Sequence, residues 1–449
     1  MMTPRKRNVH GIIGAVVLVA AQVMMLNHVE PFLSWFYALA WWSYILVIDS
    51  LVYRLKGNSL IMSRTREFLL MIVWSFTLWL FFEMVNLVMR NWYYINAPNS
   101  GLVRFFGYGV SYGTVLPGIF ETTELLETLG LFKTAPAPSF KMSRRWFAGF
   151  MITGSLFLIL PLIVPIYTFP LIWGSFIFLL EPINYRGGGK SLLADWEKGS
   201  LRKFYLLLFS GLICGFLWEF WNFWARTKWI YTVPFFDELK LFEMPLLGFL
   251  GFPPFAVECY VIYNFISLWR HNRGWEEDVF MVRPARKTSR SLKLVTIVCL
   301  VAFYIVSTRA IDRCTIDSTV VLMDDFPALT TVELEKMEGL EIATVDRLLW
   351  KTRTPVGYQR MVVDLELSPD RLDDLIRQAK LMDLLGLGRN HFLLLQKAGV
   401  DSVAALAEED PGGLHQKLLG LEESSSSARP PTRSKVKLWI LEARRRTGR

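Results

Sequence analysis

Four glutamates that could do acid/base chemistry lie within strongly apolar stretches of the sequence, and they form two matching pairs. Glu83 and Glu219 each follow an aromatic residue and precede an asparagine by three positions. Glu121 and Glu258 each follow a proline by four positions. An ionised carboxylate near a bilayer centre costs about 2.5–3.5 kcal/mol on insertion scales, whereas a carboxylic acid in an apolar pocket can stay protonated and donate its proton. The pairs predict a catalytic cavity, with Glu219 and Glu258 as the leading candidates and the other two as their counterparts.

Side chains that could hold an apolar substrate surround these acids. Aromatic rings stabilise a carbocation by cation–π attraction, which is worth about 2 kcal/mol when the site is desolvated. On a helix, the asparagine three positions after each of Glu83 and Glu219 lies on the same face as the acid. The predicted substrate-binding residues are therefore Trp218, Trp221, Asn86 and Asn222.

Some polar and aromatic residues have an alternative, structural interpretation. Acids and asparagines inside a helix bundle can form interhelical hydrogen bonds, worth about 0.6 kcal/mol each on average. Asp49 and Glu181 lie near the ends of their apolar stretches, where the Tyr-Arg pair four residues further on can contact each acid, and we predict a structural role for both. Aromatic residues near the outer ends of spans are typical of an interfacial belt. We assign to this belt Trp92, Tyr93, Tyr94, Trp229 and Tyr231.

The elements that must position these residues are nine apolar stretches. With 53% hydrophobic residues over 449 positions, the chain is much more apolar than an ordinary soluble protein. Most of the stretches have close to the ~20 residues that a membrane-spanning helix needs. In the fourth, Gly109, Gly113 and Pro117 favour close helix packing or a broken span. The stretches cover residues 9–27, 32–53, 67–91, 105–131, 146–164, 169–184, 203–225, 242–268 and 294–309.

The first eight stretches form two copies of one four-helix unit. Trp41-x-Ser43 through Ser59-Leu60 reappears as Trp173-x-Ser175 through Ser191-Leu192. Four crossings separate equivalent helices, so the two copies share one orientation. We therefore predict an all-α polytopic membrane protein with two parallel four-helix repeats, a ninth span and a small soluble helical domain. The predicted boundaries are 1–135 and 136–270 for the repeats, 271–293 for a basic cytoplasmic loop, 294–309 for the ninth span, 310–329 for a linker and 330–449 for the soluble domain.

The basic residues predict the orientation of the chain in the membrane. The net charge of +9 comes from lysines and arginines that recur on one side of the predicted spans. The positive-inside rule places the N-terminus in the cytoplasm and, after nine crossings, the C-terminal domain on the non-cytoplasmic side. No small-residue cleavage site follows the first span, which we expect to be retained. This pattern favours the cell (inner or plasma) membrane, with membrane lipid as a partner, over nucleic-acid binding.

Neither a cofactor nor a metal is predicted. The four cysteines and five histidines show no metal-binding spacing, and the histidines lie outside the spans or at their margins. The sequence also has no Walker loop, no convincing dinucleotide fingerprint and no nucleophile elbow. We therefore expect any chemistry to depend on the acids alone.

The second copy carries a run of motifs that a known family shares. Leu217-Trp218-Glu219 is followed by Trp229 and Pro234, and then by Gly251-x-Pro253 with an acid shortly after. This run resembles the lycopene cyclase domain of bacterial, archaeal and fungal carotenoid cyclases, and the resemblance covers roughly residues 32–268. It implies paired copies and acid-initiated cyclisation of the ends of a linear polyene, without a redox change. It also places Glu219 at the family's Trp-Asp acid.

The chain departs from that family at one pair of positions. Where the family has two adjacent acids, this sequence has Phe255 and Ala256, and Glu258 lies further along the helix. A shift of two or three residues turns a side chain by roughly 200–300° around a helix. The resemblance therefore supports the fold more strongly than the activity.

The C-terminal part has the composition of a soluble helical domain. Ser368-Pro369 predicts a helix start, and Leu384 to Gly388 form the turn of a helix–hairpin–helix unit. With the closing Val436-x-x-Trp439 run, residues from about 330 to 445 resemble the DUF4332 family. Helix–hairpin–helix units often bind the DNA backbone, but only Arg389 lies near this hairpin. We expect a protein partner or self-association, with DNA binding as the less favoured alternative.

These observations predict a cyclase-like enzyme, an intramolecular lyase or isomerase, that acts on a long apolar isoprenoid or carotenoid. The alternative is a non-catalytic membrane scaffold whose soluble helical tail binds a protein partner. A transporter is a third interpretation, since repeats and buried acids also suit alternating access.

Overall fold

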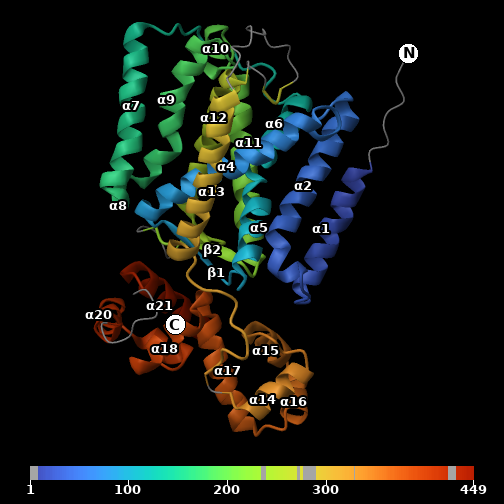
Figure 1. Cartoon of the computed structure of the whole chain (residues 1–449), viewed down its shortest axis with the longest axis vertical. Coiled ribbons are helices and arrows are strands. Elements are labelled where there is room, and N and C mark those ends of the chain that lie inside the picture. The colour runs from blue at the N-terminus through green and yellow to red at the C-terminus, as the bar shows by residue number, and fades with distance from the viewer. Residues whose placement is uncertain are drawn as a thin grey trace.

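The fold has two parts: a bundle of long helices, and a group of shorter helices that lies beyond one end of the bundle (Figure 1). The structure is a computed structural model that describes residues 9–233, 239–270, 274–276, 290–327, 329–422 and 431–448. The strands β1 and β2 lie where the two parts meet, so we call this the strand end and the opposite end of the bundle the basic end. Pro234 lies outside the described residues, as does most of the predicted basic loop 271–293.

The bundle confirms the prediction of a mostly helical, strongly apolar chain. Seven helical runs among the described residues are long and apolar enough to cross a membrane, which is compatible with membrane insertion. Two of them combine shorter pieces: α8 (Pro165–Thr168), η1 (Phe169–Leu171) and α9 (Ile172–Gly187) form one, and η2 (Leu246–Gly251) and α12 (Phe252–Trp269) form another. The remaining five are α2 (Phe32–Lys56), α4 (Thr65–Met89), α7 (Arg144–Ile163), α11 (Arg202–Trp224) and α13 (Arg290–Cys314).

Two of the nine predicted stretches, the first and the fourth, are not among these seven long helical runs. The first is α1 (His10–Leu26), an apolar helix of only 17 residues that packs along α2. The fourth is divided into α5 (Gly101–Tyr112) and α6 (Val115–Thr128). At this break the Ser75 hydroxyl donates to the carbonyl of Tyr112 at 2.6 Å and accepts from the amide of Leu116 at 3.0 Å. The neighbouring helix thus pairs backbone groups that an apolar environment would leave unsatisfied.

The repeat is visible in two short helices at the basic end, α3 (Leu60–Ser63) and α10 (Leu192–Glu197). Asp49 accepts hydrogen bonds from the Ser59 hydroxyl at 2.9 Å and the Ile61 amide at 2.7 Å. Glu181 accepts the equivalent bonds from Ser191 at 2.6 Å and Leu193 at 2.9 Å. Each acid therefore holds the start of a short helix against its bundle helix. The contacts differ from the predicted ones, since the hydroxyl of Tyr185 donates to Glu197 at 2.6 Å.

A second sign of the repeat lies at the strand end. β1 (Trp92–Ile95) follows α4, β2 (Lys228–Tyr231) follows α11, and the two strands pair antiparallel. Trp92 lies opposite Tyr231, and Tyr94 lies opposite Trp229. We call this two-stranded sheet the ribbon, and it joins the two copies directly. A smaller hairpin of β3 (Lys240–Leu241) and β4 (Met244–Pro245) precedes η2.

The C-terminal helices, which we call the tail, pack around a core of their own that includes Leu348, Phe392 and Trp439. Side-chain caps start several of these helices; Ser368, for example, accepts from the amide of Arg371 at 3.2 Å, as its sequence predicts. The helices are α14 (Thr331–Gly339), α15 (Val345–Thr352), α16 (Pro355–Asp364), α17 (Pro369–Asp383), η3 (Leu384–Gly386), α18 (Gly388–Lys397), α19 (Val403–Glu408), α20 (Pro411–Glu422) and α21 (Arg433–Thr447).

Candidate functional site

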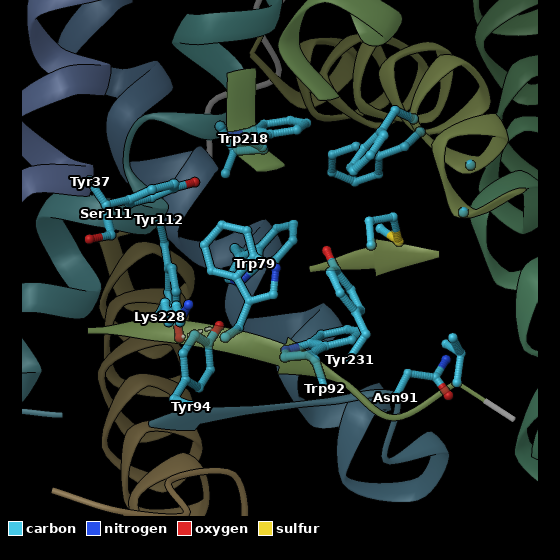
Figure 2. Close-up of a pocket in the computed structure, with 18 of the residues that line it drawn as sticks. Tyr37, Trp79, Asn91, Trp92, Tyr94, Ser111, Tyr112, Trp218, Lys228 and Tyr231 are labelled. Carbon is cyan, nitrogen blue, oxygen red and sulfur yellow. Dashed lines mark hydrogen bonds between the residues drawn. The ribbon is translucent and has the colours of Figure 1, made fainter. Parts of the chain in front are cut away.

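A cavity of about 570 Å³ lies inside the bundle next to the ribbon (Figure 2). Residues from both predicted copies, 1–135 and 136–270, line it. Its lining is dominated by aromatic side chains, which come from α2, α4, α5, α11, α12, the ribbon and the α8–η1–α9 run. They include Tyr37, Trp79, Trp92, Tyr94, Tyr112, Trp173, Trp218, Trp229, Tyr231, Phe252 and Phe255.

The ribbon presents one of its faces to this cavity. Successive residues of a β-strand point to opposite sides, so alternate positions share a face. Trp92 and Tyr94 from β1, with Trp229 and Tyr231 from β2, line the cavity from this face, and Lys228 at the start of β2 also reaches the lining. The residues between them form part of a separate apolar cluster on the other face, which contains Tyr93, Ile95 and Ile230.

In the first copy, Glu83 adjoins the cavity through the side chains that line it. Its Oε1 accepts hydrogen bonds from the Tyr94 hydroxyl at 2.6 Å, the Trp92 indole at 3.1 Å and the Trp79 indole at 3.0 Å. Glu83 is fully buried, and its Oε2 has no hydrogen-bond partner among the described residues. One carboxylate oxygen is thus held by three donors, and the other is left without one.

In the second copy, Glu219 occupies the equivalent position. Its Oε1 accepts a hydrogen bond of 2.8 Å from the Tyr231 hydroxyl. Glu219 is also fully buried, and its Oε2 likewise has no partner among the described residues. The cavity therefore carries two phenol–carboxyl pairs, Tyr94–Glu83 and Tyr231–Glu219, one from each copy.

The two phenols stay neutral in this setting. Burial raises the pKa of Tyr94 well above its ordinary value, and the nearby charge of Glu83 raises it further. Burial and the charge of Glu219 raise the pKa of Tyr231 in the same way. Each tyrosine can therefore act as a hydrogen-bond donor, and as a relay for a proton, but not as a stable phenolate.

The other two predicted catalytic acids lie away from this cavity. Glu258 accepts from the amide of Phe176 at 2.8 Å and from the Ser175 hydroxyl at 3.4 Å, so it binds the backbone and a side chain of α9 near the start of that helix. Glu121 is fully buried on α6, and neither carboxylate oxygen has a hydrogen-bond partner among the described residues. The four glutamates are thus not brought together, and only those of the first pair adjoin the cavity.

Of the predicted substrate-binding residues, only Trp218 lines the cavity. Trp221 packs edge-to-face on Trp41, with ring centroids 5.0 Å apart. The side chains of Asn86 and Asn222 bind the backbone where each helix meets its strand: Nδ2 donates to the carbonyl of Trp92 in one copy and Trp229 in the other, both at 2.9 Å. These asparagines position the ribbon and do not line the cavity.

Four of the residues that the sequence assigns to an interfacial belt line the cavity instead: Trp92, Tyr94, Trp229 and Tyr231. A signal for their role is present in the sequence, because Trp92-x-Tyr94 and Trp229-x-Tyr231 repeat the same alternation in both copies. In a strand that spacing puts both rings on one face. Among the residues that the structure describes, no three His, Cys, Asp or Glu side chains gather in a group that could hold a metal ion.

Comparison with known proteins identifies the tail but not the bundle. Residues 327–446 match DUF4332, a domain of unknown function. No curated protein and no solved structure matches the chain. The predicted resemblance of the C-terminal part is confirmed, whereas the resemblance of the apolar part to carotenoid cyclases gains no support. The chain is therefore similar to DUF4332 domains over residues 327–446. The helical bundle that precedes this part contains the aromatic cavity.

Proposed function

We propose that the bundle binds the end of a long apolar isoprenoid in the aromatic cavity and cyclises it by acid-initiated addition. The observation that carries this proposal is the pair of phenol–carboxyl groups, Tyr94–Glu83 and Tyr231–Glu219, on the wall of one apolar cavity.

The size and lining of the cavity support an apolar ligand. Small-molecule pockets typically occupy about 300–1,000 Å³ and combine apolar walls with a few placed polar groups. A cavity of about 570 Å³ falls within this range, and it takes the end of a long chain better than the whole of one. Indole and phenol rings around the cavity would stabilise a positive charge that develops on the substrate.

The chemistry can be written for this wall without a cofactor. With Glu219 protonated and the Tyr231 hydroxyl turned from Glu219 toward the substrate, Glu219 passes its proton to the phenol oxygen while the phenol proton moves to an alkene carbon. The new C–H bond leaves a cation on the neighbouring carbon, and a second double bond attacks this cation and closes a ring. A ring carbon then loses a proton, which returns through Tyr231 to the Glu219 carboxylate and restores the acid. Protons and electrons balance, so the net reaction is an isomerisation.

Expression in cells that accumulate lycopene tests this proposal. With the wild-type chain we expect pigments of unchanged mass and altered absorption, because rings replace conjugated ends. Tyr231→Phe keeps the ring but removes the relay, and Glu219→Gln removes the acid, so both should abolish the new pigment. Unchanged pigment with wild-type chain in the membrane would contradict the cyclase activity.

A second candidate function is a non-catalytic membrane scaffold. The observation that favours it is that several of the repeated polar groups, including Asp49, Glu181, Asn86 and Asn222, are used in packing. Under this alternative the phenol–carboxyl pairs are further interhelical hydrogen bonds. Tyr231→Phe would then lower the stability of the bundle and leave any bound apolar molecule unaffected.

A further inference from the structure

The two faces of the ribbon serve two different parts of the protein. One face, with Tyr94 and Tyr231, lines the cavity. The other face packs against the tail: Tyr93, Ile95 and Ile230 form one apolar cluster with Leu438 of α21, with Leu385 of η3 against it. The wall that carries the phenols is thus one layer thick, and the tail forms its outer support.

The linker between α13 and the tail extends this wall. The amide of Tyr94 donates to the carbonyl of Thr315 at 2.9 Å, and the amide of Asp317 donates to the carbonyl of Tyr94 at 2.8 Å. Three residues after Tyr94, the amide of Ala97 donates to the carbonyl of Ser318 at 3.0 Å. The linker segment therefore runs parallel to β1 and adds a third extended segment beside the two strands of the ribbon. Ile316, from the same segment, reaches the cavity lining.

The hairpin of the tail fits against the ribbon without room for a side chain. Gly386 has a φ of +63°, and a Cβ at this position would lie 2.4 Å from the Cβ of Ile95. Gly388 has a φ of +64°, and its Cβ would lie 3.1 Å from the Cβ of Ser318. The surface that could offer hairpin amides to DNA is therefore covered by the chain itself.

Two polar contacts also join the tail to the rest of the chain. Lys435 pairs with Asp317 of the linker, and its Nζ lies 4.3 Å from the centre of the Tyr93 ring. Arg226, two residues after α11, pairs with Asp346 of the tail and, at 2.7 Å, with Glu30 of the bundle. The side chains of Arg226 and Asp346 are 9% and 18% exposed, so this pair is largely withdrawn from solvent and sensitive to loss of either partner, whereas Glu30 is 48% exposed.

We infer that the partner of the tail's hairpin and α21 is the ribbon of the same chain, and that this docking holds Tyr94 and Tyr231 in the cavity wall. The tail is thus a clamp on the site. Its coupling to a bound isoprenoid rests on the proposed function, whereas the docking itself does not. Because coupling between two sites is reciprocal, a ligand that contacts the tyrosines would also tighten the tail.

A substitution in α21 can disrupt the docking of the tail on the ribbon without disturbing the core of the tail. Leu438 is 4% exposed and belongs to the cluster with the ribbon, while its neighbours Val436, Trp439 and Ile440 belong to the core of the tail. Leu438→Asp therefore buries a charge only at the interface. Val363, which is 71% exposed on α16, provides the matched control Val363→Asp.

Hydrogen exchange on the full chain in detergent, without ligand, tests the clamp. In Leu438→Asp we expect the amides of residues 92–95 and 228–231 to exchange about tenfold faster or more, since local opening sets this rate. The core helix α17 should keep its protection, and Val363→Asp should change neither. Unchanged ribbon exchange in Leu438→Asp with α17 protected would overturn the inference.

Two further measurements keep the outcomes distinct. If α17 also loses protection in Leu438→Asp, Lys435→Ala decides: faster ribbon exchange supports the clamp and unchanged exchange overturns it. With lycopene as the probe, Leu438→Asp should retain less pigment than Val363→Asp. If the wild type retains no lycopene while the ribbon still loosens in Leu438→Asp, the clamp stands and the proposed function fails.

Discussion

Asn86 donates a 2.9 Å hydrogen bond from its side-chain amide to the carbonyl of Trp92, and its carbonyl oxygen accepts from the Trp92 amide at 3.3 Å. One buried side chain therefore fixes the angle between α4 and β1. Asn222 does the same for α11 and β2 through Trp229, with bonds of 2.9 and 3.0 Å. The two asparagines, although predicted to bind a substrate, set the geometry of the wall that would contact it.

Removal of either asparagine amide should destabilise the bundle. Asn86→Ala leaves buried backbone groups of Trp92 unpaired, and we expect a loss of about 1–3 kcal/mol in the free energy of unfolding. Asn222→Ala should lose a similar amount, because the contacts are equivalent. Asn27→Ala is the control, since Asn27 is exposed and, within the described part of the chain, its side chain bonds to the carbonyl of Val23 in the preceding helix. Denaturant unfolding in detergent measures all three, and equal stability of Asn86→Ala and Asn27→Ala would contradict the role.

The acids that hold the short helices at the basic end should be replaceable by an amide side chain but not by alanine. Glu181→Gln keeps an oxygen that can accept from the Ser191 hydroxyl and the Leu193 amide, so we expect a small loss of stability. Glu181→Ala removes the acceptor and leaves a buried backbone amide unpaired, which costs about 1–3 kcal/mol. Thermal unfolding compares the two. If the amide variant is as destabilised as the alanine variant, the carboxylate has a role beyond the cap.

Many helix starts could be predicted from neighbouring residues, whereas the contacts between elements could not. Ser368-Pro369 starts α17, because a serine cap and a proline at the first helical position need only their neighbours. The repeated spacing from Asp49 to Ser59 and from Glu181 to Ser191 likewise marks equivalent corners of the two copies. The hydrogen-bond partners of these acids, however, depend on how the backbone of each copy turns after the helix that carries the acid.

The cavity could not be placed from the sequence alone because its wall depends on a long-range pairing. Trp92 and Tyr231 lie opposite each other only because β1 and β2, far apart in sequence, join in one ribbon. Without this pairing, Trp and Tyr residues near helix ends cannot be told from an interfacial belt, which has the same composition. The break in the fourth stretch is a similar case, since the hydroxyl that stabilises it belongs to Ser75 on another helix.

Lowering the pH should reduce the stability of the folded tail, because Glu333 becomes protonated. Hydrogen bonds from Arg371, with those from Thr330, lower the pKa of this carboxyl from its ordinary 4.5 to about 2, against the opposing effect of burial. A lowered folded-state pKa adds stability above the unfolded-state value, and this stability is lost as the pH falls from about 4.5 to about 2.

Glu333→Gln should remove this part of the acid sensitivity. We expect the difference in unfolding temperature between wild type and Glu333→Gln to be larger at about pH 6 than at about pH 3, because only the wild type loses the ionised group. Scanning calorimetry of the full chain measures it. Glu335→Gln, on the exposed side of the same helix, is the control and should show no such difference. A difference that does not depend on pH would contradict the assignment.

The C-terminus should lie on the non-cytoplasmic side of the membrane. The segment after α13 bonds to β1, so the tail lies at the strand end, opposite the ends of the helices that carry Arg64 and Arg202. The positive-inside rule places those basic ends in the cytoplasm. A pair of reporters, one active only outside the cytoplasm and one only inside, fused after residue 449 measures the side. A cytoplasmic signal would contradict the orientation.

The central claim is that the aromatic cavity holds an apolar chain, and one pair of variants tests it most directly. Gly107 lines the cavity, and a Cβ there would meet no atom closer than 3.9 Å, so Gly107→Leu fills space without forcing the backbone. Gly109 lies on the same helix outside the lining, with nothing within 4 Å of an added Cβ, so Gly109→Leu is the matched control. Both changes raise helix propensity equally.

The measurement is mass spectrometry of the apolar molecules that co-purify with each full-length variant from cells that accumulate lycopene. We predict an isoprenoid bound to the wild type and to Gly109→Leu at similar occupancy, and an occupancy about tenfold lower in Gly107→Leu, since overfilling a packed site costs about 1–3 kcal/mol. Equal occupancy in the two glycine variants, or no isoprenoid on well-folded wild-type protein, would contradict the account.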